Sequence, residues 1–220
     1  MEKYIRVLSQ SQLFSQTTDE EIKKALEFTG AKTRSYKNKE TILFVGDKIK
    51  SLGIIVEGGA VISREDFWGN SSVMAKLAPS QLFGMSYALS SSGLSEVNVI
   101  AEKPTKVMYF NIERLFGAVG ADLAIHSKII KNLVIELANK NIQFSSKIEH
   151  ISQRKLRDKI LSYLSEVSQR TKSSSFTIPF SRQQLADYLC SDRSALSNEL
   201  CKLRDEGVIE FRKNHFKLYN

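Results

Sequence analysis

The stretch SRQQLADYLCSDRSALSNELCKLRDEGVI, from Ser181 to Ile209, decides how the C-terminal part of the chain folds. Ser181 and Gln184 have the spacing of a capping box, which predicts that a short helix begins directly after Ser181. Ser191 or Asp192 can then cap a second helix. Leucines recur in this second helix at steps of four and three residues, which places them on one face: Leu196, Leu200 and Leu203. The stretch therefore predicts two short helices joined by a tight turn.

The opposite face of the second helix carries short hydrogen-bonding side chains, namely Ser194, Ser197, Asn198 and Cys201, with Arg193 near its beginning. In a helix-turn-helix one face packs into a three-helix core and the other enters the major groove of DNA. There Asn can bind adenine and Arg can bind guanine through two hydrogen bonds, while Ser contacts bases or phosphates. The pattern therefore predicts a DNA-reading helix. An ordinary amphipathic helical hairpin in a core is the alternative.

Apolar and polar residues alternate after Gly207, which predicts two strands, at 208–212 and 215–218, with a hairpin turn at Lys213-Asn214. Such a hairpin would form a wing beside the DNA backbone. Arg182 and Gln183, at the start of the first helix, and Lys213, in the wing, are therefore expected to contact phosphates.

The composition favours a folded protein with an anionic partner. Of the 220 residues 42% are hydrophobic, which is sufficient for packed cores, and the formal net charge is +8. No apolar run has the length of a membrane span or of a signal peptide, so we expect a cytoplasmic protein with no membrane partner. Paired carboxylates, a Ser/His/Asp order and a Gly-rich phosphate loop do not occur at persuasive spacings, so we do not expect an enzyme.

The two cysteines, Cys190 and Cys201, form no CxxC pattern, and the three histidines lie far apart in sequence. We therefore expect neither a metal site nor a bound cofactor. Buried, unreactive thiols are the prediction for both cysteines. The alternative is a redox-responsive regulator in which oxidation of Cys201, on the polar side of the second helix, disturbs DNA contact.

Short apolar segments recur from Ala31 to about Phe110, at 41–44, 52–56, 60–62, 73–77, 97–101 and 106–110. Turn residues separate them, as at Trp68-Gly69-Asn70-Ser71. About eight short strands at this spacing predict an antiparallel barrel or jelly roll, preceded by a short helix that Thr18 and Glu21 can cap. The interior of such a barrel either holds a small ligand or is filled by side chains, and both remain open.

A long helix is predicted at 122–150, because no Pro or Gly interrupts these residues. Its apolar residues recur at steps of three and four, and the predicted seam consists of Ile130, Leu133, Leu137, Phe144 and Ile148, with Asn141 among them. A seam of about three heptads is typical of a coiled coil, so we expect a parallel homodimer whose register Asn141 fixes. A long helix packed on its own barrel is the alternative.

The order of barrel, long helix and winged helix-turn-helix resembles the Crp/Fnr superfamily of bacterial transcription regulators. The matching segments are IIVEGGAV at 54–61, Phe83-Gly84, and LADYLCSDRSALSNELCKLRDEGVI at 185–209. The resemblance implies an α+β fold with a cyclic-nucleotide-binding-like β-barrel, or jelly roll, at 1–115, a dimerisation helix at 116–152 and a winged helix-turn-helix at 153–220. It also implies that a homodimer binds double-stranded DNA at a palindromic operator and contacts RNA polymerase.

The region that resembles the family's ligand cassette departs from the pattern of cyclic-AMP binders. Those proteins carry a Glu for the ribose hydroxyl and, some ten residues further on, an Arg and a small hydroxyl residue for the cyclic phosphate. Here Phe83-Gly84 is followed by Met85-Ser86, and no Arg lies between Arg64 and Arg114. Glu96 would repel a phosphate that lacks an Arg partner. We therefore expect a small effector other than cyclic AMP, or none, and the candidate pocket residues are Gly84, Met85, Ser86, Ser95, Glu96 and Asn141.

The reading helix also departs from the family pattern, in which Arg, Glu and a second Arg face the groove. The matching positions are Arg193, Ser194 and Asn198, so only the first is kept. The half-site should therefore differ from the usual family sequence. A sensor or scaffold protein that acts through protein contacts is the alternative function.

Overall fold

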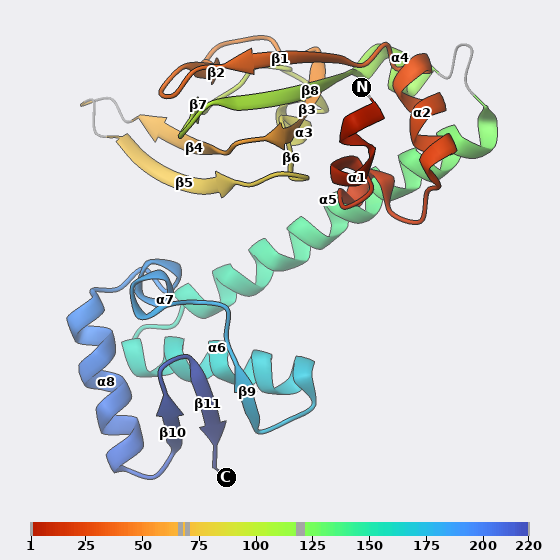
Figure 1. Cartoon of the computed structure of the whole chain (residues 1–220). Coiled ribbons are helices and arrows are strands. Elements are labelled where there is room, and N and C mark those ends of the chain that lie inside the picture. The colour runs from red at the N-terminus through yellow and green to blue at the C-terminus, as the bar shows by residue number, and fades with distance from the viewer. Residues whose placement is uncertain (1, 66–67, 69–70, 118–121, 220) are drawn as a thin grey trace. The chain divides into compact units, whose positions relative to one another are not determined.

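The computed structural model describes residues 2–65, 68, 71–117 and 122–219. The chain divides into two compact units, Met1–Ala138 and Asn139–Asn220, and the division falls within one long helix. Gly69 and Asn70 of the predicted turn lie outside the described residues. Figure 1 traces the chain from the N-terminal helices and strands to the C-terminal helices and hairpin.

The first unit begins with short helical segments that pack on one another: two 3-10 turns, Glu2–Tyr4 and Gln12–Phe14, and helices α1 (Ile5–Leu8) and α2 (Asp19–Phe28). The predicted capping box of α2 is confirmed. The Thr18 amide donates to Glu21 Oε2 at 2.7 Å, and the Glu21 amide donates to Thr18 Oγ1 at 3.2 Å. These bonds satisfy backbone groups that the first helical turn leaves without partners.

Eight strands of the described part form two antiparallel four-stranded sheets, in the orders β1-β8-β3-β6 and β2-β7-β4-β5 (Figure 1). The arrangement confirms the predicted jelly roll, because strands adjacent in space come from distant parts of the sequence. The strands are β1 (Lys32–Tyr36), β2 (Thr41–Leu43), β3 (Ser51–Glu57), β4 (Ala60–Glu65), β5 (Ser71–Leu77), β6 (Leu82–Phe83), β7 (Asn98–Ala101) and β8 (Thr105–Asn111).

Side chains of both sheets meet inside the jelly roll. Ile55, Phe83 and Val99 are buried there with other apolar residues of the two sheets. Phe83 lies so close to Gly53 that a Cβ atom at Gly53 would come within 2.4 Å of its ring. Gly53 is therefore required for the close approach of β6 to β3.

Helix α3 (Met85–Ala88) lies between β6 and β7, whereas α4 (Ile112–Gly117) and α5 (Leu123–Ile151) follow β8. The first half of α5 packs on the N-terminal helices through Ile125, Ile129 and Leu133. Asn132 adds two hydrogen bonds from Nδ2, to Leu13 O at 3.1 Å and to Ser15 O at 2.8 Å. The N-terminal segment thus belongs to the same core as the beginning of α5.

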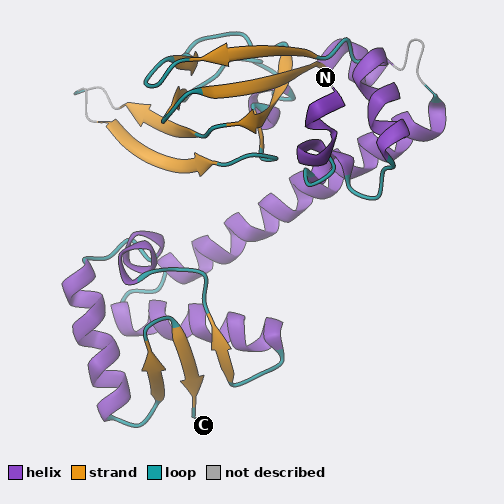
Figure 2. Cartoon of the chain, viewed as in Figure 1, coloured by secondary structure: helices purple, strands orange, loops and turns teal. Residues whose placement is uncertain are grey.

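The described part of the second unit contains the end of α5, followed by α6, α7, α8 and a three-stranded sheet (Figure 2). One apolar core joins α6, α7, α8 and the sheet and includes the three predicted leucines of the reading helix. The strand order is β10-β11-β9, so that β9 extends the predicted hairpin by one strand. This confirms the predicted winged helix-turn-helix, and its elements are α6 (Leu156–Thr171), β9 (Ser175–Thr177), α7 (Arg182–Tyr188), α8 (Arg193–Asp205), β10 (Ile209–Arg212) and β11 (His215–Leu218).

Candidate nucleic-acid interface

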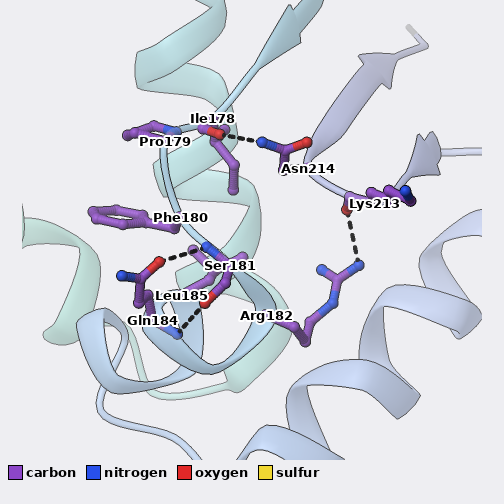
Figure 3. A pocket seen from close by; sticks show the side chains of 9 residues that line it. All are labelled: Ile178, Pro179, Phe180, Ser181, Arg182, Gln184, Leu185, Lys213 and Asn214. Carbon is purple, nitrogen blue, oxygen red and sulfur yellow. Dashed lines mark hydrogen bonds between the residues drawn. The ribbon is translucent and has the colours of Figure 1, made fainter.

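Helix α7 begins at the predicted capping box. The Ser181 amide donates to Gln184 Oε1 at 2.8 Å, and the Gln184 amide donates to Ser181 Oγ at 3.3 Å (Figure 3). The turn after α7 places Cys190 in the left-handed region, with a φ of 51°. The chain can therefore reverse directly, and the Ser191 amide donates back to Ala186 O at 2.9 Å.

Asp192, rather than Ser191, caps the reading helix α8. Its Oδ1 accepts from the Ser194 amide at 2.8 Å and from the Ala195 amide at 3.0 Å, and the Ser194 hydroxyl also donates to it. The bond from the Ser194 side chain, followed by the backbone bonds, lowers the pKa of Asp192. The carboxylate thus stays charged at the positive end of the α8 dipole.

The buried face of α8 is fully enclosed, since Leu196, Leu200 and Leu203 have no exposed surface. The other face is open. Arg193, Ser194 and Asn198 are exposed, whereas Ser197 and Cys201 are half-buried. The predicted division of α8 into a packing face and a solvent face is therefore present in the fold.

Two of the predicted reading residues use their hydroxyl protons within the helix. Ser194 donates to Asp192, and Ser197 Oγ donates to Arg193 O at 2.9 Å. The side chains of Arg193 and Asn198 form no hydrogen bond with another side chain in the described ranges. These two residues therefore keep all their donors, and the Asn198 oxygen, for an external partner.

The start of α7 is tied to the wing by Arg182. Its Nη2 donates to Lys213 O at 3.3 Å, and its guanidinium lies 5.0 Å from the Phe211 ring centre and 5.8 Å from that of Phe216. Burial lowers the pKa of Arg182. Figure 3 shows the side chain turned toward the wing turn. Arg182 thus positions the wing in addition to carrying positive charge.

The other two residues that were predicted to contact phosphates, Gln183 and Lys213, are exposed. Gln183 Nε2 donates to Asp187 Oδ1 at 2.8 Å on the next turn of α7, and Lys213 occupies the wing turn with a φ of 57°. Between α7 and the wing lies a pocket of about 500 Å³ (Figure 3), lined by both apolar and polar residues: Ile178, Pro179, Phe180, Ser181, Arg182, Gln184, Leu185, Lys213 and Asn214.

Two contacts that stabilise the winged helix-turn-helix were not predicted from the sequence, because each joins segments that lie far apart in the chain. Asn214 Nδ2 donates to Ile178 O at 3.0 Å, which ties the wing turn to the segment before α7. Arg157 of α6 lies 2.6 Å from Glu206 at the end of α8, and this bond raises the pKa of Arg157. The opposite charges of Arg157 and Glu206 would predict this ion pair only if α6 and α8 were already known to pack together.

The prediction that both cysteines are buried is wrong. Cys190 is exposed and Cys201 is half-buried, and both are free thiols. Cys190 is exposed because it occupies the tight turn between the two helices. Cys201 lies on the solvent face of α8, where its charge would act on Arg182 and Arg204.

The candidate effector residues occupy several environments, and Asn141 lies in the second unit while the other five lie in the first. Met85 is buried against the N-terminal helices, and Ser95 Oγ donates to Val97 O at 2.7 Å, whereas Ser86 is exposed. Gly84 precedes α3 with a φ of 82°. Asn141 is exposed on α5.

Glu96 forms an ion pair with Arg64, which the sequence did not predict because the two residues lie far apart in the chain. Its Oε2 lies 3.7 Å from Arg64 Nη2, because the fold brings β4 beside the segment before β7. Tyr87 of α3 is close to both, since burial first and Glu96 second raise its pKa while Arg64 lowers it. Tyr87 was not among the predicted residues.

The exposed apolar face of α5 corrects one residue of the predicted seam. Leu133 is 2% exposed in the core of the first unit, whereas Val134 is 59% exposed. Phe144 and Ile148 are also exposed, and Ile130 and Leu137 are half-buried. Residues 130, 134, 137, 141, 144 and 148 follow one another at steps of four and three along this face, and Val134 rather than Leu133 is among them.

Within the described ranges, no helix has the length and apolar character needed to cross a membrane. No group of three His, Cys, Asp or Glu side chains is placed to hold a metal ion in that part of the chain.

A jelly roll, a long helix and a winged helix-turn-helix with an open polar face define a DNA-binding regulator. Two family models match the chain: the cyclic nucleotide-binding domain at residues 33–121 and the Crp-like helix-turn-helix domain at residues 158–220. No curated protein matches the sequence.

Several solved structures share the fold. CprK in complex with OCPA has a TM-score of 0.60 at 16% identity, over 90% of this chain and 89% of that chain. The c-di-GMP-responsive regulator CLP of Xanthomonas campestris has a TM-score of 0.57 at 18% identity, over 92% and 100% of the two chains. The catabolite activator protein of Thermus thermophilus has a TM-score of 0.50 at 22% identity, over 95% and 94%.

The chain belongs to the Crp/Fnr superfamily of transcription regulators. This family consists of regulators rather than enzymes. The matched domains account for both ends of the fold, the jelly roll and the winged helix-turn-helix.

Proposed function

We propose that the chain forms a homodimer that binds a palindromic operator, with α8 of each protomer reading one half-site. The observation that carries this proposal is the two-sided character of α8. Its leucine face is completely buried, while Arg193 and Asn198 are exposed and keep their polar groups for DNA. A helix fixed in this way can enter a major groove without changing the core beneath it.

Base reading is assigned to Asn198 and Arg193, and the surrounding residues position them. Asn198 can bind the edge of an adenine, and Arg193 can bind a guanine or a phosphate. Ser194 and Ser197 contact DNA through oxygen lone pairs, because their protons are donated within α8. Gln183, Lys213 and the remaining guanidinium donors of Arg182 would contact phosphates beside the groove.

The homodimer would form through the exposed seam of α5. The seam contains apolar residues at both heptad positions and is interrupted only at Asn141. A symmetric pair of parallel α5 helices would cover Val134, Phe144 and Ile148, which are otherwise exposed apolar side chains. Asn141 would face its counterpart and fix the register, rather than line an effector pocket.

The jelly roll would sense a small effector other than cyclic AMP, or none. The Arg64 guanidinium is already paired with Glu96, so a cyclic phosphate would have to compete with a carboxylate for it. Tyr87, Glu96 and Arg64 together form a mixed polar cluster that a ligand with both donors and acceptors could use. The regulator would act in the cytoplasm, where the DNA is, and RNA polymerase would be a further partner there.

A selection of bound DNA from a random duplex pool, repeated with and without cell extract, tests the proposal. We expect enrichment of an inverted repeat whose half-sites lie about one helical turn apart, or a multiple of it. Light scattering on the purified protein should give the mass of a dimer. A monomer that enriches no duplex sequence at low salt, but captures proteins strongly, would instead support a scaffold.

A further inference from the structure

His150, in the last turn of α5, is held by α6 at both ring nitrogens. Its side chain is only 2% exposed. Nδ1 lies 2.8 Å from Ser162 Oγ, and Nε2 lies 2.6 Å from Glu166 Oε2. Ser162 and Glu166 are four residues apart and therefore lie on the same face of α6. One imidazole thus joins the end of α5 to two turns of the next helix.

The same ring contacts the helix-turn-helix itself. The His150 ring centre lies 5.8 Å from that of Tyr163 on α6 and 6.3 Å from that of Tyr188 on α7. Tyr188 also lies 5.0 Å from Phe180, in the segment that leads into α7. His150 is therefore part of an aromatic cluster shared by α5, α6 and α7.

Both charge states of the imidazole can satisfy these partners. In the neutral state Nε2–H donates to Glu166 and Nδ1 accepts from the Ser162 hydroxyl. In the protonated state both nitrogens donate, and the Ser162 hydroxyl turns to accept. Protonation strengthens the contact with Glu166, because the hydrogen bond then joins two opposite charges.

Other charged and titratable groups also lie near the His150 ring. Lys147 of α5 lies over the Tyr188 ring, 5.3 Å from its centre. The charge of Arg170 on α6 acts to lower the pKa of Tyr163 and Tyr188, against the effect of burial. Burial raises the pKa of Tyr163 to about 12 and also raises that of Tyr188, so both phenols stay neutral near pH 7.

We propose that His150 is a positioning residue that fixes the helix-turn-helix against the end of α5, and that its protonation strengthens this hold. The inference deepens the proposed function and rests on it wherever DNA binding is measured. In a dimer joined through α5, the distance between the two reading helices depends on how each helix-turn-helix is held at the end of α5. A firmer hold at this point would keep that distance matched to the two half-sites.

DNA affinity measured against pH is the first test. We expect the affinity of the wild type to rise about fivefold more than that of His150→Gln between about pH 8 and about pH 6. Glu166→Gln, which keeps hydrogen-bonding groups but removes the charge, should flatten the profile in the same way. It also serves as a second variant if His150→Gln folds poorly, because the Glu166 side chain is 36% exposed.

His215→Gln is the matched control. His215 also has a partner at each ring nitrogen, Ser175 Oγ and Thr177 Oγ1 at 3.0 Å, but it is exposed and neither partner is charged. This variant should keep the pH dependence that is lost in His150→Gln. Equal pH profiles for the wild type, His150→Gln and Glu166→Gln would overturn the inference.

A double-mutant cycle in urea unfolding separates this inference from the proposed function. His150→Gln, Glu166→Gln and their combination should show a coupling that is larger at about pH 6 than at about pH 8. If no DNA is bound at any pH, the proposed function fails while the cycle still tests the pair. Additive effects of the two substitutions at both pH values would show that His150 and Glu166 are not coupled, and would overturn the inference. Coupling that leaves the pH dependence of DNA affinity unchanged would show that His150 stabilises the fold without positioning the helix-turn-helix for DNA, and would also overturn it.

Discussion

Leu133 and Val134 are neighbours in α5 with opposite surroundings, since Leu133 is 2% exposed and Val134 is 59% exposed. Consecutive residues of an α-helix are about 100° apart, so one points into the core of the first unit while the other lies on the exposed seam. The same helix therefore serves two interfaces, an internal one that the structure shows and an external one that we propose.

Val134→Glu should separate the dimer without unfolding the protomer, because it places a charge in the apolar seam. The predicted result is a monomer by light scattering with an unchanged melting temperature at low protein concentration. Gln143→Glu is the control, since residue 143 lies on α5 outside the seam. A dimer that persists in Val134→Glu would contradict a seam in this register.

Leu133→Ala should instead destabilise the first unit by about 2–5 kcal/mol, because it leaves a cavity in a packed core. Urea unfolding measures this loss directly. A cost of well under about 1 kcal/mol would show that the packing of α5 on the N-terminal helices contributes little.

Asn198→Ala should cost about 1–3 kcal/mol of discrimination at one base pair of each half-site. The side chain is exposed and forms no side-chain hydrogen bond within the described ranges, so its loss should leave stability nearly unchanged. Binding of the selected operator and of its single-base variants measures the effect. An equal loss on every sequence would remove Asn198 from base reading.

Lys213→Gln should weaken binding to all duplex sequences alike, because it removes a phosphate contact. The slope of log affinity against log salt should fall by about 1. Gel-shift titrations at several salt concentrations give this slope. A slope that stays the same would place the wing turn away from the DNA backbone.

Asp192→Asn should reduce the pH dependence of stability near the start of α8. Hydrogen bonds led by that from Ser194 hold the folded-state pKa of Asp192 below its unfolded value. The stabilisation is thus present above the unfolded pKa and is lost as pH falls through the folded one. Thermal unfolding from about pH 6 to about pH 2.5 should show a smaller loss in Asp192→Asn than in the wild type. An equal loss in Asp192→Asn and in the wild type would contradict this role of Asp192.

Cys201→Ser tests the redox alternative. The thiol lies on the solvent face of α8 near Arg182 and Arg204, where oxidation would place a polar group at the DNA surface. Mild peroxide should weaken DNA binding of the wild type, and Cys201→Ser should be resistant. If peroxide has no effect on the wild type, the redox version of the function is excluded.

Local sequence patterns were sufficient to predict the elements and, through their order, the family. Capping boxes at Ser181 and Thr18, the leucine spacing of α8 and the recurring short strands each depend on residues close together in the chain, so local patterns suffice to predict them. The order of these elements then gave the resemblance that both family models confirm.

Local patterns could not predict which surfaces are buried, because burial depends on the packing of distant segments. Leu133 and Val134 are equally apolar, and their environments differ because the N-terminal helices cover one side of α5. Arg64 reaches Glu96, Arg157 reaches Glu206 and His150 reaches Glu166 across turns and strands that no local spacing encodes. Burial and charge pairing depend on which segments pack together, and that is a property of the whole fold.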